Sequence, residues 1–273
     1  MSFLERTKFL LREYRIFPNR LLGQNFMVDS SILQSMATYA SLNRNDVVLD
    51  IGAGLGFLTR FLSNRCESVL AVESDVQLVK VLREQVKDLS NVKIVEGDVL
   101  KARISRFDKV VSIPPYGISS RLLLWLFGKG FDCAVLIFQK EFANRLVASV
   151  GSEDYGWLTV FAYYHVEVEL LDDVPRWVFY PQPEVDSIII RLKPRKVLPF
   201  KLKNEVLFKQ LVRSLFTQRN RKVRNAMLSF VKSTPAVATE EAVKLVEAFA
   251  FCDKRVRELA PEDFGVLADA LVD

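Results

Sequence analysis

The sequence predicts an α/β fold, in which a parallel sheet covered by helices is followed by a small all-helical C-terminal domain. Two observations support this prediction. Between residues 47 and 149, short apolar runs alternate with helix-like segments, and the runs are apolar on both faces, as parallel strands between helices are. Beyond Pro194 the composition becomes strongly basic, and the hydrophobic pattern is helical to the end.

Periodicity and capping residues place the elements of the first part. Helices are expected over 2–14 and 29–41, with Asp29 or Ser30 as the N-cap of the second. The alternating strands are expected at 47–51, 68–72, 92–95, 109–113 and 133–138. The helices between and after them are expected at 56–63, 75–87, 118–127 and 141–149. Two further β-rich runs, 166–174 and 187–193, follow these elements.

The change in charge suggests a domain boundary. From Lys193 to Arg224 basic residues dominate, and Glu205 is the one acid in that stretch. We therefore expect a first domain over residues 1–195, with residues 1–42 as its N-terminal helices, and a helical domain over residues 196–273. The net charge of +5 is only weak evidence for a nucleic-acid partner; the clustering of charge is the stronger sign.

Composition argues against several classes of protein. Half of the residues are hydrophobic, which supplies a sizeable core. The three cysteines are far apart and there is one histidine, so we expect neither a disulfide framework nor a metal site. No apolar run approaches the roughly 20 residues of a membrane span, and charges interrupt the N-terminus. A cytoplasmic protein without membrane association is expected.

A glycine-rich turn follows the strand expected at 47–51. Gly52, Gly54 and Gly56 lie between this strand and a helix, where glycine allows a ligand to approach the backbone closely. A dinucleotide fingerprint would place its third glycine at position 57, where Phe57 stands. The spacing disfavours NAD and favours a ligand without a pyrophosphate, although a purely structural turn is the alternative.

Two acids follow the next two strands. Glu73 can accept hydrogen bonds from ribose hydroxyls, and Asp98 from an adenine amino group. Either acid alone is more simply a helix cap or a surface charge. Together with the glycine turn, at three successive strand ends, they favour a methyltransferase site for S-adenosylmethionine.

The turn after the strand at 109–113 has an unusual composition. Pro114 and Pro115 make it rigid and leave carbonyl oxygens available to an exocyclic amine. Tyr116 can stack on a purine that has been flipped out of its helix. The alternative is a strand that ends at proline beside a packed tyrosine.

Motifs along nearly the whole chain resemble one family, the KsgA-type rRNA adenine N6-dimethyltransferases. The segment ending in Phe17-Pro18-Asn19-Arg20 is similar to archaeal members. In chain order, the motifs that carry the resemblance are Gly23-Gln24-Asn25-Phe26, Asp50 to Gly56, Glu73, Gly97-Asp98, Pro115 to Ser120, Gln139-Lys140-Glu141, Tyr155-Gly156, Phe179 to Ser187 and Gln218 to Arg224.

The resemblance implies a Rossmann-like class I methyltransferase sheet. It also implies dimethylation of two adjacent adenines in the 3′-terminal hairpin of small-subunit rRNA, with S-adenosylmethionine as methyl donor. The cofactor residues would be Asn25, Met27, Asp50, Gly52, Gly54, Glu73, Ser74, Asp98, Val99 and Ser112. The target base would meet Ile113, Pro114, Pro115, Tyr116 and Phe179, with Tyr116 and Phe179 on its two faces.

The basic run would bind rRNA phosphates in the immature small ribosomal subunit, and the chain would act as a monomer. The RNA-binding residues would be Arg213, Arg219, Arg221, Lys222 and Arg224. The alternative for this run is an ordinary solvated helix face.

The sequence departs from the family at one position of the target-base turn. The family pattern is Asn-(Leu/Ile)-Pro-Tyr, and alignment through Pro115 and Tyr116 places Ile113 at the asparagine. In the family, the asparagine oxygen and a neighbouring carbonyl accept the two N6 hydrogens, which frees the nitrogen lone pair. Ile113 has no acceptor, whereas the carbonyl of Pro114 remains. Loss of one acceptor costs about 1–3 kcal/mol, roughly 5- to 150-fold in rate.

We therefore expect a weakened methyltransferase that tends toward monomethylated product. Two alternatives stay open: a small-subunit assembly factor with little catalysis, and an enzyme for another RNA or DNA adenine. The basic C-terminal domain favours a large folded RNA.

Overall fold

The computed structural model describes residues 1–19, 23–233 and 251–272 and divides the chain into two units. Unit 1 contains Met1–Ala143 and Glu167–Pro194, and unit 2 contains Asn144–Val166 and Arg195–Asp273. The expected division at residue 195 differs from this one in the segment Asn144–Val166, which belongs to unit 2. Its helix α7 (Trp157–His165) packs on α8 (Glu205–Phe216), and the Phe161 and Phe208 ring centroids lie 6.0 Å apart.

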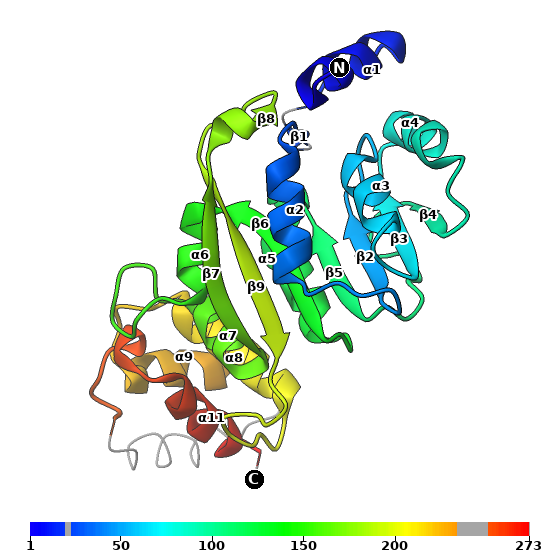
Figure 1. The fold of residues 1–273 in the computed structure, drawn as a ribbon. Coiled ribbons are helices and arrows are strands. Elements are labelled where there is room, and N and C mark those ends of the chain that lie inside the picture. Colours follow the sequence, from blue (N-terminus) through cyan, green and yellow to red (C-terminus); the bar gives the residue numbers. More distant parts are fainter. Residues whose placement is uncertain (20–22, 234–250, 273) are drawn as a thin grey trace. The chain divides into compact units, whose positions relative to one another are not determined.

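Unit 1 is built on a seven-stranded sheet of order β4-β3-β2-β5-β6-β9-β7 (Figure 1). The strands are β2 (Val47–Ile51), β3 (Ser68–Glu73), β4 (Val92–Glu96), β5 (Lys109–Ser112), β6 (Cys133–Gln139), β7 (Val166–Val174) and β9 (Ser187–Pro194). The strands from β4 to β6 are parallel, and β9 is antiparallel to β6. The predicted parallel sheet is confirmed, and each strand lies within about one residue of its expected position.

The helices of unit 1 bury apolar residues. They are α1 (Phe3–Glu13), α2 (Ser30–Tyr39), α3 (Phe57–Ser63), α4 (Val76–Val86), α5 (Ser119–Phe127) and α6 (Lys140–Leu146), and α6 ends in unit 2. The buried apolar residues of α1 cluster with α4 and the turn after β2, and not with the seven-stranded sheet. Leu33 and Met36 of α2 share a fully buried cluster with Leu62 of α3 and with residues of β2, β3, β5 and β6. Asp29, one of the two N-caps expected for α2, caps this helix, and Asp75 caps α4.

A second, two-stranded sheet was absent from the predictions. Strand β1 (Phe26–Met27) pairs antiparallel with β8 (Phe179–Tyr180), which follows a short 3₁₀ helix, η3 (Arg176–Val178). Strands of two residues carry no readable alternation, so only the tertiary pairing reveals them. Figure 1 shows this pair at the same end of unit 1 as α1.

Unit 2 is helical, with an aromatic core. Beside α7 and α8, its described residues contain α9 (Val223–Ser233), the 3₁₀ helix η4 (Val256–Glu258) and α11 (Pro261–Asp269). Phe216 of α8 stacks on Phe264 of α11 with ring centroids 5.3 Å apart. Helix α7 was not predicted, because six of its nine residues are buried and its apolar residues define no single stripe.

Within the described part of the chain, no helix is both long and apolar enough to cross a membrane. Those residues also contain no group of three or more histidine, cysteine or acidic side chains that could hold a metal ion.

Candidate active site

The glycine turn lies at the end of β2 and has the backbone that its glycines allow. Gly52, Gly54 and Gly56 all have positive φ angles, of 75°, 57° and 82°, a region that other residues enter at a cost. The N–H groups of Gly52 and Ala53 donate to the carbonyl of Val72 at the end of β3, at 2.8 and 3.1 Å. The turn is therefore tied to the neighbouring strand end.

The side chain of Glu73, the last residue of β3, accepts a hydrogen bond from the same turn. Gly54 N–H donates to one carboxylate oxygen at 2.9 Å, and the N–H groups of Ser74 and Asp75 donate to the other at 2.8 and 2.9 Å. The residue is 6% exposed, and burial raises the pKa of Glu73 while these hydrogen bonds oppose the rise. The oxygen that binds Gly54 accepts one hydrogen bond and retains a lone pair, so this oxygen can also accept from a ligand.

Asp50 lies beneath the turn and is almost fully buried. Its carboxylate accepts a hydrogen bond from Thr59 Oγ1 of α3 at 2.6 Å. Burial raises the pKa of Asp50 to about 7, Thr59 opposes the rise, and the nearby charge of Glu73 adds to it. Asp50 and Thr59 connect β2 to α3 on the two sides of the glycine turn.

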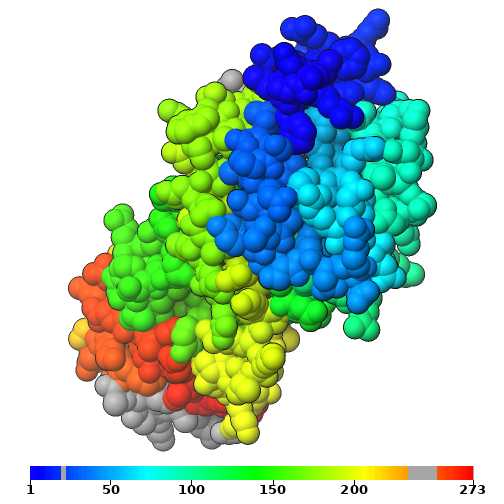
Figure 2. All heavy atoms as spheres, viewed as in Figure 1, coloured from blue at the N-terminus to red at the C-terminus, as the bar shows by residue number. Residues whose placement is uncertain are grey.

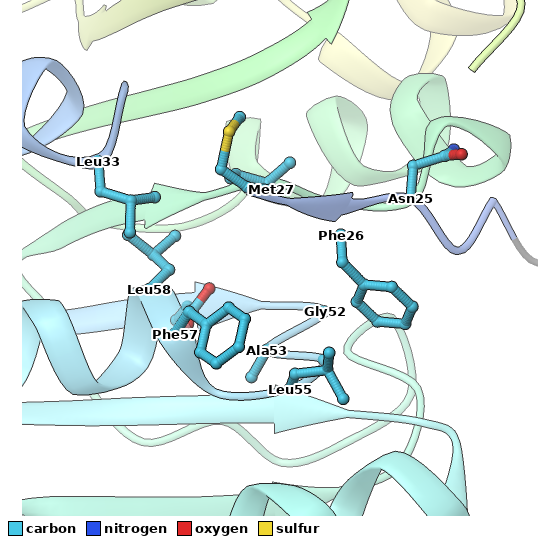
Figure 3. Close-up of a pocket in the computed structure, with 12 residues that line it drawn as sticks. Asn25, Phe26, Met27, Leu33, Gly52, Ala53, Leu55, Phe57 and Leu58 are labelled. Carbon is cyan, nitrogen blue, oxygen red and sulfur yellow. The ribbon is translucent and has the colours of Figure 1, made fainter. Parts of the chain in front are cut away.

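The N-terminal segment around residues 24–27 lies over the glycine turn. Gln24 Nε2 donates to Asp75 Oδ2 at 2.8 Å, which ties this segment to the cap of α4. Figure 3 shows the Phe26 ring extending from β1 toward the glycine turn, whereas Asn25 and Met27 point the other way. A Cβ on Gly54 would lie 3.4 Å from the Phe26 ring, which is van der Waals contact.

A cleft between β1 and the turn brings part of the predicted cofactor set together (Figure 3). Of the predicted residues, it is lined by Asn25, Met27, Asp50, Gly52, Gly54 and Ile113. It is also lined by residues that the sequence analysis did not assign: Phe26, Leu33, Ala53, Leu55, Phe57 and Leu58. Phe26 belongs to the Gly-Gln-Asn-Phe motif, and Ala53 and Leu55 belong to the motif from Asp50 to Gly56, which were the sequence signals for this group.

The cleft holds about 60 Å³, less than the roughly 300–1,000 Å³ of typical ligand sites. A nucleoside-sized ligand would therefore extend beyond it, along the strand ends toward Glu73 and Asp98.

The remaining predicted cofactor residues do not line the cleft. Asp98 follows β4, and one oxygen of its carboxylate accepts from Leu100 N–H at 2.9 Å. Val99 is buried, and Ser74 contributes the backbone N–H that binds Glu73. Ser112 has no exposed surface; its hydroxyl donates to the Ile51 carbonyl at 2.6 Å and accepts from Ile51 N–H at 3.0 Å. The Ser112 side chain thus joins the ends of β5 and β2.

The predicted target-base turn packs directly on the glycine turn. Pro115 caps a 3₁₀ helix, η2 (Tyr116–Ile118), and a Cβ on Gly52 would lie 2.9 Å from Pro115 Cδ. Pro114 is buried. The partly buried Ile113 lines the cleft and packs against the buried sheet cluster, which is the cluster that contains Leu33 and Leu62. The hydroxyls of Tyr116 and Ser187 lie 2.6 Å apart, and burial raises the pKa of Tyr116.

Phe179, the second predicted base-stacking residue, lies in the core. It is 2% exposed, is the register partner of Met27, and belongs to the buried sheet cluster. In this structure its ring offers no free face, so its contact with a base stays a prediction.

The predicted RNA-binding residues all belong to unit 2, and each contacts a group within that unit. Arg219 donates to the carbonyls of Glu153 and Ser152 at 2.7 and 2.8 Å. Arg213 lies over the Trp157 ring, and Arg221 donates to Gln218. Lys222 and Arg224 both pair with Asp253. Four of the five, all except Arg219, are exposed.

The sheet order, the positive-φ glycine turn and the carboxylate at the second strand end define a class I methyltransferase domain of the Rossmann-like type. The chain matches the ribosomal RNA adenine dimethylase family over residues 18–253 and belongs to this family.

Curated relatives agree along nearly the whole chain. The chain is 37% identical to a probable ribosomal RNA small subunit methyltransferase A of Methanosarcina acetivorans, over 97% of each chain. It is 41% identical to one of Thermococcus onnurineus, over 95% of this chain and 94% of that one. A Geobacillus ribosomal RNA small subunit methyltransferase A is 34% identical, over 97% and 96%.

Solved structures show the same fold. A dimethyladenosine transferase from Plasmodium falciparum matches 88% of this chain and 94% of its own, with a TM-score of 0.76 and 28% identity. The 23S rRNA methyltransferase ErmE matches 91% of this chain and 100% of its own, with a TM-score of 0.64 and 28% identity.

Proposed function

We propose that this chain transfers methyl groups from S-adenosylmethionine to N6 of two adjacent adenines in the 3′-terminal hairpin of small-subunit rRNA, at a rate reduced by Ile113. The observation that carries the proposal is the contact between the glycine turn and the Pro114-Pro115-Tyr116 turn at Gly52 and Pro115. Through this contact, the glycine turn, which suits the cofactor, lies next to the turn whose carbonyl oxygens suit a purine amine. The curated relatives, which carry small-subunit names, support the choice of RNA.

The residues around the cleft fit the cofactor. Bound there, S-adenosylmethionine supplies an electrophilic methyl group. The positive-φ glycines let the backbone approach it, Glu73 accepts from its ribose, and Asp98 from its adenine amino group. A Cβ on Gly54 would meet the Phe26 ring at 3.4 Å, so a side chain there would narrow the cleft.

The chain's own residues position the adenine. Tyr116, fixed by its hydroxyl contact with Ser187, stacks on the base, and the Pro114 carbonyl accepts one N6 hydrogen. Ile113, which lines the cleft, has a hydrocarbon side chain where the family pattern has the second acceptor. The missing acceptor leaves the N6 lone pair partly delocalised into the ring, which slows each transfer and favours monomethylated product.

The proposal is tested by incubating the full chain with S-adenosylmethionine and unmethylated small subunits, followed by mass spectrometry of the rRNA 3′-terminal hairpin. Slow appearance of monomethylated and then dimethylated adenines is the expected result. Full dimethylation at the rate of a relative that has asparagine at the position of Ile113 would contradict the role of Ile113. Methylation of another RNA only would contradict the substrate.

One observation favours a second function. Ile113 removes a catalytic acceptor while the exposed basic side chains of unit 2 are kept. A small-subunit assembly factor with little catalysis would bind immature subunits in the same assay and leave the adenines unmodified.

A further inference from the structure

A second pocket of unit 1 lies outside the cofactor cleft. It is formed where α1 and the chain after it meet β8, and it holds about 430 Å³, within the range of ligand sites. It is lined by Lys8, Leu11, Arg12, Arg15, Ile16, Phe17, Pro18 and Tyr180. We call it the N-terminal pocket. Figure 2 shows α1 at this end of unit 1 in dark blue.

The N-terminal pocket has an apolar floor and charged walls. Leu11 and Ile16 are buried and pack in one cluster with Tyr180. Lys8, Arg12 and Arg15 supply three positive charges, and none of them has an acidic partner within 4 Å in the parts of the chain that the structure describes. Lys8 Nζ lies 5.3 Å from the centroid of the Tyr180 ring. Positive charge without internal neutralisation suits an anionic ligand.

Phe17 gives the N-terminal pocket a free aromatic face. Its side chain is 88% exposed, the most exposed of the phenylalanines in the described chain. An exposed aromatic ring beside unpaired cations is the combination with which proteins hold single-stranded nucleic acid, because bases stack on the ring and phosphates meet the cations. A purely apolar ligand would leave the cations unused.

The N-terminal pocket is also a close neighbour of the cofactor cleft. Tyr180, which lines it, is the register partner of Phe26, which lines the cofactor cleft. Register partners on an antiparallel pair lie side by side on one face. The two sites are thus separated by one pair of cross-strand side chains.

We propose that the N-terminal pocket binds one unpaired nucleotide of the substrate RNA, next to the target adenines, with its base on Phe17 and its phosphate on Arg12 and Arg15. This inference rests on the proposed function for the identity of the RNA. It extends the RNA contact of the chain from the basic residues of unit 2 to the N-terminal segment of unit 1.

The test measures binding of full-length protein to a fluorescent hairpin RNA that carries two adjacent adenines, by anisotropy. A series of RNAs replaces each nucleotide around the adenines, one at a time, with an abasic residue. At one flanking position we expect the abasic RNA to bind about 5- to 150-fold more weakly, the range of one base–aromatic stack. Phe17→Ala removes this difference, and Lys93→Ala, at an exposed lysine of the edge strand β4, retains it.

The charges are tested separately, with Arg12→Gln and Arg15→Gln. Each should lower the slope of log affinity against log salt, and the double variant should lower it by about 0.7, the value for one phosphate of a single strand. Thermal unfolding of each variant checks that it is folded. The inference is wrong if removal of a base weakens RNA binding by the same factor in Phe17→Ala as in wild type at every position tested.

The same proteins, assayed for methyl transfer, keep the two proposals apart. Methylation with no effect of Phe17→Ala on RNA affinity would overturn the pocket and leave the proposed function standing. Phe17-dependent RNA binding without methylation would support the pocket and overturn the proposed function.

Discussion

The ring of Pro115 occupies the space in which a side chain at Gly52 would begin. A Cβ on Gly52 would lie 2.9 Å from Pro115 Cδ, and Gly52 has a φ of 75°. Because the proline ring is rigid and lies against a fixed strand end, neither partner can yield cheaply. This contact couples the glycine turn to the proposed target-base turn.

We expect Gly52→Ala to destabilise the protein by about 1–3 kcal/mol, since alanine is strained at this φ and clashes with Pro115. It should also weaken the binding of S-adenosylmethionine. Thermal unfolding and titration calorimetry measure the two effects. Gly117→Ala is the matched control, because a Cβ there meets nothing within 4 Å. Equal melting temperatures for both variants would contradict the coupling.

Glu73→Gln tests the carboxylate that holds the glycine turn. An amide has only one acceptor oxygen, so either Gly54 N–H or the N–H groups of Ser74 and Asp75 lose their partner. The expected loss in unfolding free energy is about 1–3 kcal/mol, with weaker cofactor binding. Urea unfolding and calorimetry provide the measurements. The control is Glu96→Gln, at the register partner of Glu73 on β4, which should change neither the unfolding free energy nor the affinity for the cofactor.

Asp50 should make stability depend on pH. Its pKa rises from 3.8 to about 7 on folding because burial disfavours the charge. Between these values the unfolded chain has released the proton and the folded chain has not, so stability falls as pH rises and levels off above about 7. Asp50→Asn carries no such proton. Its unfolding free energy relative to wild type should therefore increase from pH 4 to 7, and a constant difference across that range would refute the assignment.

Ile113→Asn restores the acceptor that the family pattern has at this position. We expect methyl transfer about 5- to 150-fold faster than wild type, with more dimethylated product, because both N6 hydrogens then have an acceptor. The control is Ile113→Leu, which keeps a hydrocarbon side chain. Quantitative mass spectrometry of the methylated RNA gives the rates. A variant no faster than wild type would show that Ile113 does not limit the reaction.

Arg219 and Arg221 separate structural from RNA-binding roles in unit 2. Arg219→Ala loses two charge-assisted hydrogen bonds to the carbonyls of Ser152 and Glu153 and should cost about 1–3 kcal/mol of stability. Arg221→Ala loses only an exposed contact with Gln218 and should stay within roughly 0.5 kcal/mol. It should still weaken RNA binding. Melting temperatures and salt-dependent RNA affinities measure both, and equal destabilisation would contradict this division.

The local structure around several candidate-site residues was predictable because its signals are local. Gly52, Gly54 and Gly56 indicate positive φ angles directly, since few other residues adopt them cheaply. Glu73 and Asp98 were placed by counting to the ends of apolar strands, and parallel strands end at one edge.

Other residues of the site were out of reach of such counting. Phe26 is in the cleft, and Phe179 is in the core, because β1 pairs with β8, a contact between residues about 150 positions apart. The bond from Ser112 to Ile51 likewise depends on the order of β5 and β2 in the sheet. Helix α7 has no stripe to reveal it, because unit 2 surrounds most of its surface.

The sequence by itself thus determined the alternation of strands and helices, the glycine turn and its acids, and the isoleucine at position 113. These follow from backbone sterics and from hydrophobic periodicity, which act over a few residues. Only the tertiary structure decided which strands are neighbours, that Pro115 packs on Gly52, and that Arg219 donates its hydrogen bonds to carbonyls of unit 2. Those outcomes depend on the packing of segments that are distant in the chain, and no local pattern encodes it.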